Sequence, residues 1–83
     1  MLKDIIEANV IENYVLFLRF EDGLEGEIDI SSIVPFEGIF DKLKDQDYFK
    51  TVKVDHELGT IVWDNGADLS PDYLYYVIVS QKK

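Results

Sequence analysis

Three aspartates are the first residues in this sequence to suggest an active site. Asp64, Asp68 and Asp72 recur at every fourth position around an expected strand-to-helix junction. Clustered carboxylates can hold a hard cation or keep a proton for acid–base catalysis. A calcium loop starting at Asp64 fails, however, because Gly66 and Tyr75 would stand where oxygen ligands are needed. We therefore interpret these aspartates as turn, cap and helix-dipole partners, with a metal-dependent or acid–base enzyme as the alternative.

Other groups that catalysis commonly uses are scarce. His56 is the only histidine, and the chain has no cysteine. The sequence shows no nucleophile–base pair, no glycine-rich phosphate loop and no nucleophile elbow. The central lysines are interleaved with acids and form no basic patch: Lys42, Lys44, Lys50 and Lys53. We predict a protein that is not an enzyme and that has no catalytic residues, metal ligands or cofactor.

Acidic residues dominate the charge of the chain. Asp and Glu number 17 against 8 Lys and Arg, which gives a formal net charge of −9. This charge repels phosphate backbones and anionic lipids, so we expect no direct binding to nucleic acid or to a membrane. Solubility explains such a charge in many proteins, and recognition of a basic protein partner is the alternative explanation.

Length and composition indicate one small domain that covers residues 1–83. The hydrophobic fraction of 47% is ordinary for a folded protein. No apolar run approaches the roughly 20 residues that span a bilayer, and the N-terminus lacks the pattern of a signal peptide. With no cysteine available for disulfides, these features favour a cytoplasmic protein.

Alternating hydrophobicity and turn residues predict the strands and the short elements between them. We expect strands at residues 2–11, 14–20, 24–30, 51–55 and 60–63. Residues 14–20 are apolar on both alternating sets, which is typical of a central strand. Asp22-Gly23 predicts a hairpin turn, and Gly59 suits a second one. Residues 38–43 have the spacing of a short helix, and residues 45–49 predict a loop or a single turn.

The stretch from residue 59 to 79 carries the strongest local signals. After the last strand, Asn65-Gly66 permits a sharp turn. Ser70 can cap a helix, and Pro71 fits its first position. The residues that follow also suit a strand, but Pro71 would interrupt a central one, so we predict a helix. The fold class is therefore α+β: a small antiparallel sheet of about five strands, one short central helix, and a C-terminal helix packed on the sheet.

Two groups of residues are candidates for binding a partner. Glu25, Glu27 and Asp29 alternate with apolar residues, so they should project together from the solvated face of the sheet. The C-terminal helix is apolar all round, and a small domain can cover only one side of it. With Leu74 and Ile78 in the core, the residues left toward solvent or a partner are Tyr75, Tyr76 and Val79. Tyrosines at the edge of the core, with their hydroxyls in water, are the other interpretation.

Several segments of the chain together resemble the bacterial family known as domain of unknown function 2442. They cover residues 20–23, 27–30, 40–43, 47–52 and 60–72. The most specific segment starts at Trp63 and ends at Asp72, and Asp64 stands where many members have proline. The resemblance implies a small α+β domain with no established catalytic residues. Some members carry a helix-turn-helix DNA-binding module, which we do not expect here because the sequence ends at Lys83.

These observations lead to one functional hypothesis and one alternative. We expect a small acidic protein-interaction module that binds a basic protein partner or self-associates. The resemblance adds an antitoxin-like role, because members are often encoded beside another small protein. The alternative is the metal-dependent or acid–base enzyme that would use the aspartates near the strand-to-helix junction.

Overall fold

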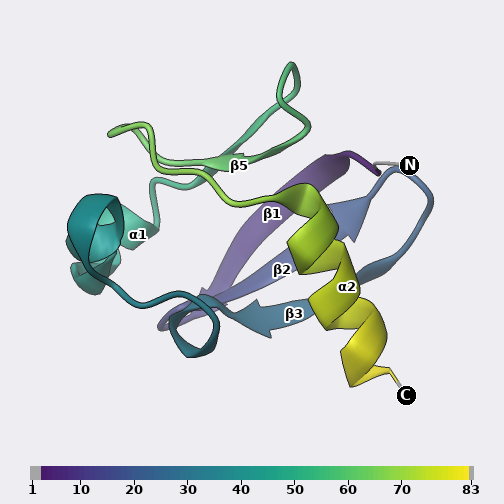
Figure 1. The fold of residues 1–83 in the computed structure, drawn as a ribbon, viewed down its shortest axis with the longest axis horizontal. Helices are drawn as coiled ribbons and strands as arrows, with labels where there is room; N and C mark the ends of the chain where they lie inside the picture. The colour runs from purple at the N-terminus through teal and green to yellow at the C-terminus, as the bar shows by residue number, and fades with distance from the viewer. Residues whose placement is uncertain (1–2, 83) are drawn as a thin grey trace.

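The computed structural model describes residues 3–82, in which three strands are followed by three short helical pieces, two more strands and a final helix (Figure 1). In chain order they are β1 (Ile5–Glu12), β2 (Val15–Phe20), β3 (Glu25–Asp29), the 3-10 helices η1 (Ile30–Ser32) and η2 (Gly38–Lys44), α1 (Gln46–Phe49), β4 (Lys53–Asp55), β5 (Thr60–Val62) and α2 (Pro71–Gln81). The predicted α+β class is confirmed. The predicted start of the first strand at Leu2 lies outside the described residues.

The five predicted strands are present, and they divide between two antiparallel sheets. One sheet has the order β1-β2-β3, and the other consists of β4 and β5. The prediction that the second strand is central is confirmed, because β2 pairs with β1 on one side and with β3 on the other. The β2–β3 and β4–β5 turns contain Gly23 and Gly59, which adopt positive φ angles of 93° and 71°. Such angles favour glycine, as the sequence indicated.

Helix α2 lies across one face of the three-stranded sheet (Figure 1). Its start is the predicted one: the Ser70 hydroxyl accepts a hydrogen bond from the Tyr73 N–H at 3.4 Å, and Pro71 is the first helical residue. Leu74 and Ile78 are fully buried, as predicted. We call the sheet face toward α2 the inner face and the opposite one the outer face.

The core lies between the two sheets, α2 and the central segment, which comprises η2 and α1 at residues 38–49. Its largest fully buried side chains include Trp63, Phe20 and Phe49. Trp63 is 2% exposed, and its indole N–H donates to the Phe49 carbonyl at 3.0 Å, so its polar atom is satisfied within the core. Within the described part of the chain, no helix is long and apolar enough to cross a membrane.

The central segment is helical, in two short pieces. The short helix predicted at residues 38–43 is the 3-10 helix η2. The predicted loop or single turn at residues 45–49 contains the one-turn helix α1, capped by the Asp45 carboxylate, which accepts from the Asp47 N–H at 2.9 Å. This piece places Phe49 in the core.

Candidate protein-binding surface

The outer face of the three-stranded sheet gathers acidic side chains from all three strands. Directly opposed residues on neighbouring strands share a face, so the pairing register defines rows across the sheet. Three outward rows result: Glu7–Arg19–Glu25, Asn9–Phe17–Glu27 and Glu12–Val15–Asp29. We call these nine residues the acidic sheet face. It carries five carboxylates and one cation around the half-buried side chains of Phe17 and Val15.

Arg19, the cation of this face, is held by acids on both sides. Its Nη1 lies 2.8 Å from Glu7 Oε1, and its Nε lies 2.9 Å from Glu25 Oε2. The hydrogen bond with Glu25, followed by the charge of Glu7, raises the pKa of Arg19 above its ordinary value. Its guanidinium carbon also lies 5.7 Å from the centre of the Phe17 ring. The first row is therefore an ordered, internally paired group.

The three acids predicted to bind a partner are exposed on this face, but their surroundings differ. Glu25 is paired with Arg19. Asp29 caps η1, because its Oδ1 accepts from the N–H of Ser31 at 3.0 Å and from its hydroxyl at 2.6 Å. Glu27 makes no side-chain hydrogen bond or ion pair within residues 3–82. The sequence analysis did not predict that Glu7, Glu12 and Phe17 share this face. Their position depends on the pairing register and not on any local pattern.

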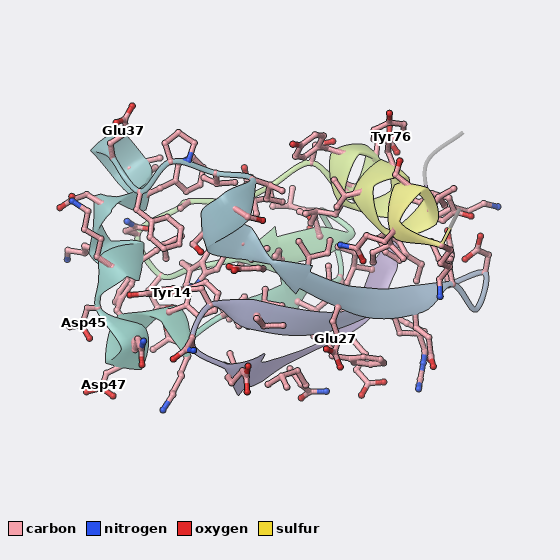
Figure 2. All side chains as sticks on the ribbon, turned by 90° about the horizontal axis from the view of Figure 1, so that it is seen from below. Tyr14, Glu27, Glu37, Asp45, Asp47 and Tyr76 are labelled. Carbon is pink, nitrogen blue, oxygen red and sulfur yellow. The ribbon has the colours of Figure 1, made fainter. Side chains whose placement is uncertain are left out.

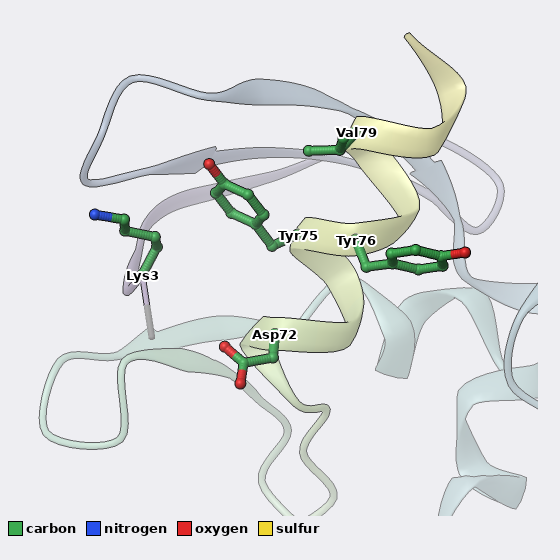
Figure 3. A pocket seen from close by; sticks show the side chains of 5 residues that line it. All are labelled: Lys3, Asp72, Tyr75, Tyr76 and Val79. Atoms are coloured by element: carbon green, nitrogen blue, oxygen red, sulfur yellow. The ribbon is translucent and has the colours of Figure 1, made fainter. Parts of the chain in front are cut away.

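The helix residues predicted to bind a partner lie around a shallow hollow beside α2. Tyr75, Tyr76 and Val79 line it together with Lys3 and Asp72, and its volume is about 400 Å³. Figure 3 shows the rings of Tyr75 and Tyr76 pointing to opposite sides of the helix. Tyr76 is 67% exposed, whereas Tyr75 and Val79 are half-buried.

Tyr75 is engaged within the domain. Its hydroxyl donates to Asp22 Oδ2 at 2.6 Å, and its ring meets that of Phe20 edge to face at 5.0 Å between centres. This bond is the main cause of the lowered pKa of Asp22 and of the raised pKa of Tyr75. Tyr75 thus fastens α2 to the β2–β3 turn.

The two predicted groups lie on opposite sides of the molecule. Figure 2 shows Tyr76 and Glu27 projecting in opposite directions, with the three-stranded sheet between them. The six predicted residues therefore form two surfaces, and one partner surface cannot contact both without wrapping around the domain. The acidic sheet face is the more strongly charged of the two.

The aspartates of the enzyme alternative do not come together. Asp64 pairs with Lys53 at 3.3 Å, Asp68 takes part in a backbone bridge with Val62, and Asp72 lies in the first turn of α2. His56 is exposed in the β4–β5 turn. Among residues 3–82, no group of three or more histidine, aspartate or glutamate side chains is placed to hold a metal ion.

The turn at residues 64–66, which follows β5, joins the small sheet to the central segment. The N–H of Asn65 donates to the Tyr48 hydroxyl at 2.8 Å, and its side-chain amide donates to the Ile39 carbonyl at 2.9 Å. Its Oδ1 accepts from the Ala67 N–H at 3.0 Å. These side-chain bonds are typical of a turn that is fixed in place, so we assign Asn65 an architectural role.

Comparison with known proteins gives one match. A family model described as "Protein of unknown function (DUF2442)" matches residues 5–80. No curated protein and no solved structure matches the chain.

Proposed function

The chain belongs to the DUF2442 family of proteins of unknown function, and from its surface we propose that it is a protein-interaction module whose acidic sheet face binds a basic protein. The observation that carries this proposal is the gathering of Glu7, Glu12, Glu25, Glu27 and Asp29 around Phe17 and Val15. An apolar centre with a polar rim is the usual anatomy of an interface. In the antitoxin-like form of the proposal, the partner is a basic toxin.

Charge favours a basic partner over a second copy at this face. The only cation in the three rows, Arg19, is already paired with two carboxylates. Two copies meeting through this face would oppose acids with acids, and like-charge contacts disfavour a complex. A basic partner instead gains electrostatic steering, which accelerates association and depends on salt.

Charge-reversal variants provide the test. Glu12→Lys/Glu27→Lys changes two acids of the face that make no side-chain hydrogen bond in the described chain. Glu37→Lys/Glu57→Lys is the matched control, because it changes the net charge equally at exposed positions outside the face. Each tagged variant is used for pull-down from cells of the source organism, and the bound protein is identified by mass.

Wild type and control should retain the same basic protein in stoichiometric amount, and the face variant should lose it. The proposal is wrong if both double variants retain the protein equally. It is also wrong if the wild-type chain retains no basic protein in stoichiometric amount from these cells.

A further inference from the structure

Strand β3 forms a free edge of the sheet, next to the acidic sheet face. It pairs with β2 on one side, and no described strand pairs with its other side. Figure 2 looks onto this edge, where β3 runs across the front of the molecule and Glu27 points away from α2. An edge strand presents main-chain groups that can pair with another chain.

Two hydrogen bonds at its ends fix which main-chain groups of β3 face outward. The Phe20 N–H donates to the Leu24 carbonyl at 2.8 Å, and the Ile30 N–H donates to the Tyr14 carbonyl at 2.9 Å. In an antiparallel pair, hydrogen-bonded and non-hydrogen-bonded residues alternate. Between these two bonds, the residues whose main-chain groups point away from β2 are Glu25, Glu27 and Asp29.

The outward groups are largely without a partner. The Asp29 carbonyl accepts from the Ser32 hydroxyl at 2.7 Å. Within residues 3–82, no hydrogen bond reaches the main-chain N–H of Asp29 or either main-chain group of Glu25 and Glu27 in the outward direction. The same three residues thus present exposed carboxylates on one face and available backbone groups along the edge.

We propose that the β3 edge binds its partner by strand addition: an extended basic segment pairs antiparallel with β3 and places Lys or Arg opposite these acids. This inference rests on the proposed function, since it specifies how a basic partner binds. Strand addition obtains affinity from main-chain hydrogen bonds and specificity from alternate side chains. The partner segment should therefore carry basic residues at every second position, where cross-strand pairs of opposite charge stabilise the sheet.

The residues between the basic ones should be apolar. They would project to the inner face, where Ile78 of α2 packs over Gly26. In Figure 1 the last turns of α2 reach beyond β3, so an added strand would lie beneath the helix. A second copy of β3 does not meet these requirements, because it would oppose acids with acids along the whole edge.

A set of synthetic peptides tests the main-chain part of the proposal. The parent is a short peptide that alternates lysine and valine, and a second peptide has the same composition with the order scrambled. Two further peptides carry backbone N-methyl groups. One is methylated only at its lysine residues, and the other only at its valine residues. In antiparallel pairing the lysine amides face β3, whereas the valine amides face away. Binding is measured by fluorescence anisotropy of the labelled peptide.

Methylation of the lysine amides should weaken binding about tenfold or more, because two or more hydrogen bonds are lost. Methylation of the valine amides should leave binding unchanged, and the scrambled peptide should bind as weakly as the lysine-methylated one. Equal binding by all four peptides would overturn strand addition while leaving a purely electrostatic face intact. If Glu12→Lys/Glu27→Lys does not weaken binding of the parent peptide, the proposed function itself fails.

Two substitutions at one position separate charge from main-chain pairing on the protein side. Glu27→Gln removes the charge alone. Glu27→Pro also removes the outward N–H, which takes no part in the native ladder, and proline is tolerated at such edge positions. The proline variant should bind the parent peptide more weakly than the glutamine variant, and equal binding by the two folded variants contradicts the proposal. If the proline variant does not fold, the methylated peptides decide the question alone.

Discussion

The hydroxyl of Tyr75 in α2 donates a hydrogen bond to the carboxylate of Asp22 in the β2–β3 turn, at 2.6 Å. The residues are far apart in sequence, and the bond connects the last helix to the β2–β3 hairpin. It raises the pKa of Tyr75 and lowers that of Asp22, whose carboxylate also accepts from the Leu24 N–H. Both shifts mean that the native state favours neutral tyrosine beside ionised aspartate.

Tyr75→Phe should therefore destabilise the protein most near neutral pH. Asp22 has a lowered pKa in the folded state, so its contribution is present above the ordinary aspartate value of about 4 and is lost as the pH falls through the folded-state pKa. Tyr75 has a raised pKa, so its contribution is present below about 10 and is lost as the pH rises through the folded-state pKa. Melting temperatures of wild type and variant should converge at both extremes. Tyr76→Phe, at a residue 67% exposed, is the control and should match wild type at every pH.

Trp63→Phe should lower the free energy of unfolding by about 1–3 kcal/mol. The substitution removes the indole N–H that bonds the Phe49 carbonyl and leaves unfilled space in the core. Urea unfolding followed by circular dichroism should show a lower midpoint with an unchanged slope. An unchanged midpoint would show that this bond and the indole contacts contribute little to the free energy of unfolding.

Local signals in the sequence identified most elements but not their pairing. Ser70 and Pro71 mark the start of α2, and Asp22-Gly23 marks the β2–β3 hairpin, because cap and turn chemistry acts within a few residues. The division into two sheets depends on packing around Trp63 and on the contacts of the central segment, which no short window of sequence contains. Strand ends were the least accurate part of the prediction, because they are set by pairing with other strands and not by a local signal.

The candidate surface was predictable only in part for the same reason. Alternation along one strand correctly placed Glu25 and Glu27 on a solvated face. Their neighbours Glu7 and Phe17 join them through cross-strand register, which shifts in β1 between Ile5 and Glu7 and again between Val10 and Glu12. Helical spacing did not show that Tyr75 bonds to a distant turn, so the sequence grouped it with Tyr76, which is free of such a bond in residues 3–82.

Gly26→Ala tests the close approach of α2 to β3. A β-carbon at this position would lie 2.8 Å from Ile78 Cγ2, which belongs to a fully buried side chain. Overpacking of this kind typically costs about 1–3 kcal/mol. Ile78→Leu removes the methyl branch that causes the clash, so the double variant should lose less stability than the sum of the two single variants. Additive losses, measured by thermal unfolding, would contradict the contact.

Arg19→Gln should strengthen binding to a basic segment, because it removes the one cation of the acidic sheet face and frees Glu7 and Glu25. The gain should be about two- to fivefold for the alternating lysine–valine peptide, since exposed charges contribute little individually. It should disappear at high salt, where exposed charges are screened. Lys53→Gln is the matched control: it changes the net charge equally and also breaks an exposed ion pair, but on the small sheet. Equal strengthening by both variants would show that net charge, and not the acidic sheet face, determines binding.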